Sequence, residues 1–261
     1  MDQAEVCPVS FQGETLKDAS DIPYVDKVVA FVDILGFAAH VQAIDQDSEL
    51  HKRLHWALTH ISSYRTISVM VNPKLGISVF SDCIAVTGER EDYHSVIWAV
   101  AWVHANLWGA GILTKGGISF GKVFHSNEIL YGEGLLKAYD IEKSAAVYPR
   151  IVVDPALADC LPDRYKNVFL SMDSDGLFFV DPFALDGTVG DADALLADGW
   201  DPHEAYLDEV EKHIKRGRSE AARVDHKSKW TWLGARHAIA KEEYKKTRQT
   251  RLSSLMKETM K

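Results

Sequence analysis

The stretch of residues 95–114, which contains no charged side chain, constrains the fold more than any other feature of this sequence. In a chain with 26% charged residues, such a segment belongs either in a membrane or in a protein core. His104, Asn106 and two glycines interrupt it, and no basic cluster flanks it, which favours a helix packed inside a core. The chain also begins with polar and acidic residues, unlike a secretory signal. We therefore expect a cytoplasmic protein that does not associate with membranes.

The net charge of −9 is distributed unevenly along the 261 residues. Residues 212–261 hold 15 Lys and Arg against 5 Asp and Glu, a net of +10, and the remainder holds 14 against 33, a net of −19. An acidic body argues against nucleic-acid binding, because phosphates require a positive surface. The basic end mixes Lys, Arg and Glu as a solvated helix does. Three widely spaced cysteines indicate neither a disulfide framework nor a structural zinc site.

Segments typical of strands and helices alternate along the chain and predict an α+β protein with helices on a face of the sheet. The domain prediction is a polar lead-in over 1–26, a main domain over 27–185, and a linker with a basic helical extension over 186–261. We expect strands or hairpins at 27–33, 75–80 with 83–87, 113–124, 150–154, and 167–172 with 177–180. We expect helices at 37–62 with a break near 45–48, at 92–109, at 132–147 and from 202 onward, whereas 64–71 fits a strand or a helix end.

Three glycines lie inside the predicted strand at 113–124, namely Gly116, Gly117 and Gly121. Glycine weakens a strand interior, so it is found there where another backbone or a ligand approaches closely. We expect such a close approach along this strand.

Two acidic residues each follow an apolar run, Asp33 in FVDILGF and Asp82 in VFSDCIAV. Carboxylates at neighbouring strand ends repel each other unless a cation lies between them, and hard oxygen ligands suit Mg²⁺ or Mn²⁺. Gly36 marks a turn into a helix, whose first N–H groups are able to hold a phosphate. Metal ions beside such a turn are suited to attack on a phosphorus atom. Acids at strand ends are also common as ordinary loop residues, and spacing alone leaves both interpretations open.

These segments resemble, in the same order, the motifs of class III nucleotidyl cyclases. The likeness covers about residues 27–154 and rests on VVAFVDILGF (28–37), Phe80-Ser81-Asp82 with Ser81 where a glycine is usual, KGGISFGKV (115–123), and Tyr131–Gly132 followed by a helix and RIVVD (150–154). The resemblance implies a class III nucleotidyl cyclase-like fold with a ferredoxin-like βαββαβ core, here followed by a helical C-terminal extension. It also implies a homodimer with active sites at the interface.

The resemblance implies roles for individual residues. Asp33, Asp82 and the Ile34 carbonyl would hold two divalent metal ions, Mn²⁺ or Mg²⁺. The triphosphate of a nucleoside triphosphate substrate would contact the backbone of Gly36 and Phe37 and the side chain of Lys115, which takes the place of a phosphate-contacting arginine. The ribose 3′-hydroxyl would then attack the α-phosphate and release pyrophosphate.

The base pocket departs from the purine cyclases. Ser78 stands where they carry a lysine that reads adenine, and Ile129 stands where they carry an acid or threonine. Loss of such hydrogen bonds changes base choice strongly, so adenylate cyclase activity is disfavoured. Phe80 flanks the expected pocket and narrows it against purines, or else belongs to the strand core.

The Asn-x-x-x-Arg pair that stabilises the transition state in this family is also missing, because Leu136 and Asp140 stand in its place. Either the enzyme is inactive or other groups stabilise the developing charge. Arg150 is our candidate for that role, and a salt-bridged structural arginine is the alternative.

A narrower resemblance favours activity. YGEGLLKAYDIEKSAAVYPRIVVD (131–154) and HKSKWTWL (226–233) resemble the pyrimidine cyclases of bacterial Pycsar antiphage defence. The implied reaction converts UTP to cyclic UMP, or less readily CTP to cyclic CMP, and the product activates a separate effector. The alternatives are a catalytically silent cyclase-like binding or signalling module and a purine cyclase with a rebuilt base pocket.

Several other residues receive structural interpretations. We expect a hairpin turn rather than a calcium loop at 173–176, because no acidic residue completes the twelve-position calcium pattern. We expect His125 to be solvated. Trp230 and Trp232 are expected to dock against the body or a partner, and Cys83 to be a buried, unreactive thiol.

Overall fold

A computed structural model describes residues 22–72, 74–126, 129–187 and 201–259. Most of the predicted lead-in and of the Gly- and Asp-rich linker lies outside these residues. The strands are β1 Val25–Ile34, β2 Gly76–Phe80, β3 Cys83–Glu89, β4 Thr114–His125, β5 Leu130–Gly132, β6 Ile151–Val153, β7 Leu170–Met172 and β8 Phe178–Val180. The α-helices are α1 Phe37–Ala43, α2 Ser48–Val71, α3 Tyr93–Gly109, α4 Glu133–Ser144, α5 Pro155–Cys160, α6 Asp163–Phe169, α8 Pro202–Glu220 and α9 Val224–Thr259, with 3-10 turns η2 Arg90–Asp92 and η3 Pro182–Gly187.

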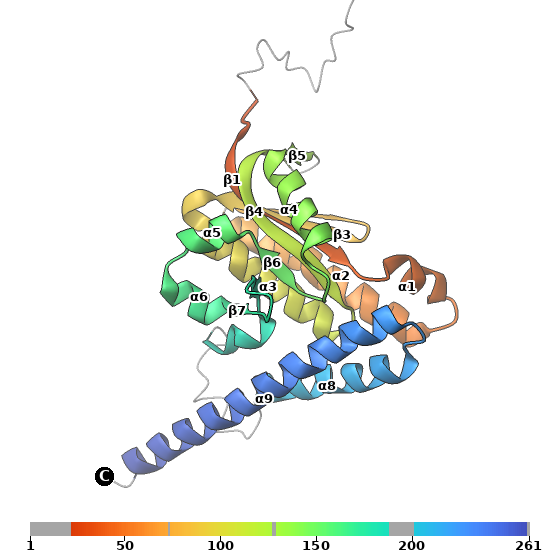
Figure 1. Ribbon diagram of the computed structural model, residues 1–261, viewed down its shortest axis with the longest axis vertical. Helices are drawn as coiled ribbons and strands as arrows, with labels where there is room; N and C mark the ends of the chain where they lie inside the picture. Colours follow the sequence, from red (N-terminus) through yellow and green to blue (C-terminus); the bar gives the residue numbers. More distant parts are fainter. Residues whose placement is uncertain (1–21, 73, 127–128, 188–200, 260–261) are drawn as a thin grey trace, which may run out of the picture.

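The strands form one sheet in the order β2-β3-β1-β4-β6-β8-β7, and β5 pairs with the end of β4 (Figure 1). Strands β1 to β4 pair antiparallel in the order β2-β3-β1-β4, with α2 between β1 and β2 and α3 between β3 and β4. This is the topology of a ferredoxin-like βαββαβ unit, so the predicted α+β class and core are confirmed. Beyond that unit, α4 leads into β6, which is parallel to β4, and the β7–β8 hairpin extends the sheet.

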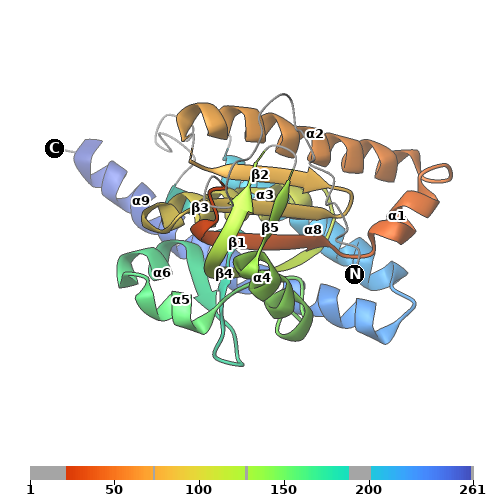
Figure 2. The ribbon, with the colours of Figure 1, turned by 90° about the horizontal axis from the view of Figure 1, so that it is seen from above.

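Helices cover both faces of the sheet, and α2 and α4 lie on opposite sides of it (Figure 2). Alternate residues of β1, including Val28 and Val32, enter a core shared with α2 and α3. The uncharged segment forms the buried helix α3, which confirms the prediction of a core helix. In the described part of the chain, no helix has the length and apolar character needed to cross a membrane.

Helix α4 packs closely on the glycine-containing face of β4. A Cβ atom on Gly117 would lie 2.2 Å from the Ala138 carbonyl oxygen, and one on Gly121 would lie 3.0 Å from Gly134. Only glycine lets the helix backbone approach the strand this closely. The predicted close approach along β4 is therefore confirmed, and its cause is α4.

Local signals predicted most element positions, with differences at the ends. The expected break at 45–48 separates α1 from α2, and residues 64–71 continue α2 as helix. Residues 167–169 end helix α6 instead of joining strand β7, because that strand pairs with β8 only from Leu170. Helix α5 and strand β5 were not expected, since each is too short for a periodic pattern.

The C-terminal helices α8 and α9 lie side by side and pack beneath the end of α3 (Figure 1). Leu207, Val210 and Ile214 of α8 share a second core with Trp108 of α3. Trp232 stacks on Tyr148 with ring centroids 5.8 Å apart. The docking predicted for this tryptophan is thus confirmed, and it is docking against the body.

Candidate functional site

Asp33 lies near the end of β1, on the face of the sheet that α4 covers. It pairs with Cys83 of β3 on one side and with Lys115 of β4 on the other. Phe31 lies two residues earlier on the same face, and its ring packs edge-on against Tyr139 of α4 at 5.4 Å. The alternation of β1 therefore places the Asp33 carboxyl away from the apolar core and toward α4.

Asp82 lies in the turn between β2 and β3, beside Asp33. Its carbonyl oxygen accepts a hydrogen bond of 2.9 Å from the Ile34 amide, which ties the turn to the end of β1. Ser81 adopts a left-handed conformation, with φ of 56°, at the position where the resembling family has glycine. Oxygen atoms of Asp33 and Asp82 and the Cys83 sulfur all lie within 4.8 Å of one another. The structure brings together the two acids that the sequence singled out.

The electrostatics of this pair suit a divalent cation. Burial raises the pKa of Asp33 from 3.8 to about 6, and the nearby charges of Glu142 and Asp82 add to the rise while Lys115 opposes it. A cation bound between the carboxylates would relieve this repulsion. Burial also raises the pKa of the Cys83 thiol to about 12, so the metal-free site holds a neutral thiol, a soft donor that hard divalent ions do not prefer. The donor set is therefore two carboxylates, which fits Mg²⁺ or Mn²⁺.

Glu142 of α4 belongs to this cluster, although the sequence assigned it no role. Its buried carboxylate forms an ion pair with the ammonium of Lys115. Lys115 thus lies near both Glu142 and Asp33, and Asp82 lies beside Asp33. Glu142 lies within the segment 131–154 that resembles pyrimidine cyclases, but only the packing of α4 on β4 shows that it orients the predicted phosphate-binding lysine.

The turn after β1 has the predicted backbone geometry. Gly36 is left-handed, with φ of 73°, and precedes the first turn of α1, which begins at Phe37. Within the described residues no side chain caps this helix, and Gly36 is exposed beside the acid pair. Ile34, the predicted carbonyl ligand, ends β1 between Asp33 and this turn.

The predicted base-pocket residues Ser78 and Phe80 lie on the edge strand β2, and Phe80 ends that strand two residues before Asp82. The Ser78 hydroxyl and the His125 Nε2 atom are 2.8 Å apart, and His125 Nδ1 is 2.6 Å from the Thr87 hydroxyl. The expectation that His125 is merely solvated was wrong, because β4 ends over β2 and β3. Phe80 is 80% exposed, so its alternative reading as strand core was also wrong. Ile129 is exposed in the loop before β5.

Arg150 forms ion pairs with two acids other than Asp33 and Asp82. It is 1% exposed, and its guanidinium binds the carboxylates of Asp173 and Asp175 and donates to the Ala145 carbonyl at 3.1 Å. These contacts favour the salt-bridged structural arginine over the transition-state role. The expected turn at 173–176 is therefore also an anchor for β6. Leu136, in place of the family's asparagine, is 63% exposed on α4.

Comparison with known proteins gives similarity to solved structures only. No protein-family model and no curated protein sequence matches the chain. Similar structures include the adenylyl cyclase CyaB from P. aeruginosa (15% identity, TM-score 0.43, 60% of this chain and 93% of that chain). They also include the monomeric guanylyl cyclase domain of the RhoGC fusion protein from Blastocladiella emersonii (13%, TM-score 0.40, 60% and 95%). A bacterial light-regulated adenylyl cyclase aligns at 15% identity and TM-score 0.42 over 60% of this chain, which spans 50% of its length.

Proposed function

We propose that this protein is a nucleotidyl cyclase that converts a nucleoside triphosphate to a 3′,5′-cyclic monophosphate and pyrophosphate. The observation that carries this proposal is the juxtaposition of Asp33 and Asp82, with donor atoms within 4.8 Å, on strand ends beside the Lys115–Glu142 pair. Residues 27–185 would form the catalytic domain and 186–261 its extension.

The residues of the site would have different roles in this reaction. Asp33, Asp82 and the Ile34 carbonyl would hold two divalent ions. Such ions, when bound, promote ionisation of the ribose 3′-hydroxyl and neutralise charge on the leaving pyrophosphate. Lys115, oriented by Glu142, supplies a fixed positive charge for a phosphate oxygen. The exposed backbone after Gly36 supplies N–H donors for the triphosphate.

A pyrimidine substrate, UTP in preference to CTP, fits the base-pocket residues better than a purine. Ser78 offers a short hydroxyl where purine cyclases place a lysine, and that hydroxyl is already hydrogen-bonded to His125. The protruding ring of Phe80 flanks the same strand end and narrows the space available to a base. A purine cyclase with a rebuilt pocket would need another residue to read the base edge.

We further propose that the enzyme is a homodimer acting in antiphage defence through a cyclic-nucleotide effector. Large apolar side chains exposed around α4 and the sheet edge support an interface between two copies. They are Phe80, Tyr131, Leu136, Tyr139 and Val147. The defence role rests on the resemblance of residues 131–154 and 226–233 to Pycsar cyclases.

A silent cyclase-like nucleotide-binding module is the second candidate. Leu136 and Asp140 are exposed where the family has its transition-state pair, and Arg150 is held by other carboxylates. A binding module, however, has less need of paired metal-binding acids. The two candidates differ in whether any product forms.

Mass spectrometry of purified protein incubated with each of the four ribonucleoside triphosphates and Mn²⁺ tests the proposal. We expect cyclic UMP, with less cyclic CMP, and no product from Asp33→Asn. Asp26→Asn, on the exposed start of the same strand, is the matched control and should retain activity. Nucleotide binding without any cyclic product would favour the silent module, and cyclic AMP or cyclic GMP would favour the rebuilt purine pocket.

A further inference from the structure

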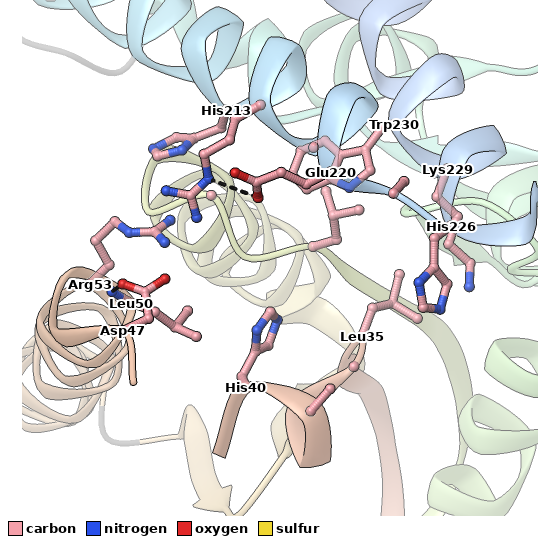
Figure 3. A pocket seen from close by; sticks show the side chains of 17 residues that line it. Leu35, His40, Asp47, Leu50, Arg53, His213, Glu220, His226, Lys229 and Trp230 are labelled. Atoms are coloured by element: carbon pink, nitrogen blue, oxygen red, sulfur yellow. Dashed lines mark hydrogen bonds and ion pairs between the residues drawn. The ribbon is translucent and has the colours of Figure 1, made fainter. Parts of the chain in front are cut away.

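A cavity of about 320 Å³ lies between the β1–α1 turn, the start of α2 and the C-terminal helices α8 and α9 (Figure 3). Leu35 and Gly36 form part of its wall, so it begins two residues after Asp33. Trp230 of α9 closes another side. Its volume is at the lower end of the range for small-molecule sites. The cavity therefore joins the C-terminal extension to the loop beside the candidate metal site.

Cationic side chains enter this cavity from both ends. Figure 3 shows Arg53 of α2 on one side and Lys229 of α9 on the other, and Arg216 of α8 also lines the cavity. Arg53 donates through Nη1 to the Ala110 carbonyl at 2.7 Å, while its buried Nη2 has no hydrogen-bond partner among the described residues. Lys229 forms no ion pair with the residues that the structure describes. Two nitrogen donors are thus available to a ligand.

The positive charges in the cavity are only partly compensated. Asp47 and Glu220 also line it, but the Asp47 carboxylate caps α2 through the Leu50 amide at 2.8 Å, and Glu220 pairs with Arg216 at 3.4 Å. Burial, followed by the charge of Arg216, lowers the pKa of Arg53. An unpaired buried guanidinium nitrogen is costly, and an anion in the cavity would satisfy it.

Three histidines line the same cavity, and its positive charges lower the pKa of two of them. Burial lowers the pKa of His40 and of His213, and the charges of Arg53 and Arg216 lower both further. Both imidazoles are therefore neutral at pH 7, and the N–H of His213 donates to the Gly109 carbonyl at 3.1 Å. The third, His226, lies beside Lys229 at the end near Leu35 (Figure 3).

We propose that this cavity is a binding site for a di- or triphosphate group, held by Arg53, Arg216 and Lys229. Guanidinium and ammonium groups make short, charge-assisted hydrogen bonds to phosphate oxygens, and several converging on one cavity favour a ligand with several charges. Because Gly36, whose backbone is assigned to the triphosphate, lines the cavity, the phosphate group belongs to the substrate and is the terminal part of its triphosphate. The assignment of this phosphate group to the substrate rests on the proposed function, whereas the binding site itself does not. The basic extension then completes the active site instead of serving as a separate tail.

Isothermal titration calorimetry with inorganic tripolyphosphate, in EDTA and 150 mM salt, tests the site without metal at Asp33 and Asp82. We expect Lys229→Gln to weaken binding about tenfold, as for the loss of one charge-assisted contact. Lys227→Gln removes the same charge two residues away on α9, outside the cavity, and should bind as the wild type does. Arg53→Lys keeps the charge but loses the second donor, and should weaken binding as well.

Equal binding by Lys229→Gln and Lys227→Gln, or no binding by the wild type, would overturn the proposed site. Turnover measurements separate this result from the fate of the proposed function. A raised KM for the triphosphate in Lys229→Gln identifies the substrate as the source, and an unchanged KM refutes that source. If tripolyphosphate binding depends on Lys229 but the protein forms no cyclic product, the proposed binding site stands and the cyclase proposal is rejected.

Discussion

Replacement of Asp33 by asparagine should stabilise the metal-free protein while removing its activity. In the fold, burial and the charges of Glu142 and Asp82 raise the pKa of Asp33 from 3.8 to about 6. At pH 7.5 the ionised carboxylate therefore costs free energy in the folded state. A rise of the pKa from 3.8 to about 6 corresponds to an upper value of about 3 kcal/mol, and partial exposure of Asp33 to water reduces this cost to roughly 1–2 kcal/mol.

Urea unfolding in EDTA measures this cost directly. At pH 7.5 we expect Asp33→Asn to unfold with a free energy about 1–2 kcal/mol higher than the wild type. The sign follows from linkage: because the folded pKa is raised, wild-type stability from this group is full below pH 3.8 and is lost as pH rises toward about 6. The advantage of the variant should therefore vanish near pH 4. Asp26→Asn, at an exposed position of the same strand, should show no such pattern.

Addition of Mn²⁺ reverses the comparison. The wild type binds the ion in the folded state and gains stability, whereas Asp33→Asn lacks one of the two carboxylates and gains less. Two results would refute the reasoning: a variant no more stable than the wild type in EDTA at pH 7.5, or equal stabilisation of both proteins by Mn²⁺.

Three further predictions concern the body of the fold, and urea denaturation measures each. Burial lowers the pKa of His104 to about 3, so protonation of this group should lower the wild-type free energy of unfolding by about 1.4 kcal/mol per pH unit as the pH drops below 6.5. His104→Gln should show a shallower dependence of stability on pH. Equal slopes of stability against pH for the two proteins would contradict this. Arg150→Ala should lower the free energy of unfolding by about 3 kcal/mol, because it leaves the carboxylates of Asp173 and Asp175 without their cationic partner. The folded fraction of this variant should turn over substrate normally. Loss of turnover at unchanged stability would support the catalytic role instead. Gly117→Ala should lower the free energy of unfolding by about 2 kcal/mol, because its Cβ would lie 2.2 Å from the Ala138 carbonyl oxygen. An unchanged free energy of unfolding would show that α4 moves away from β4 at little cost.

Sequence reasoning succeeded where the signal was local. The β-branched run ending at Asp33 is a strand, and the apolar runs around Ser81–Asp82 form a hairpin. The glycines of β4 predicted the close approach that α4 makes. Adjacent strand ends then bring Asp33 and Asp82 together, because the pairing of β1 with β3 follows from the topology.

Sequence reasoning failed where partners come from distant segments. The sequence near Arg150 does not indicate that the turn between β7 and β8 brings Asp173 and Asp175 to its guanidinium. Lys115 and Glu142 meet only because α4 crosses β4. The cavity lined by Arg53 and the C-terminal helices has no sequence signature, since its walls are more than 150 residues apart.

Phosphorus-31 NMR of the reaction with UTP and Mn²⁺ tests the central claim most directly, because it identifies the bond that forms and the bond that breaks. We predict equal amounts of a 3′,5′-cyclic phosphodiester and pyrophosphate from the wild type, and neither from Asp33→Asn or Asp82→Asn. Linear UMP with pyrophosphate, or UDP with phosphate, would show that the acid pair serves hydrolysis. Cyclic product from both variants would show that Asp33 and Asp82 do not carry the reaction.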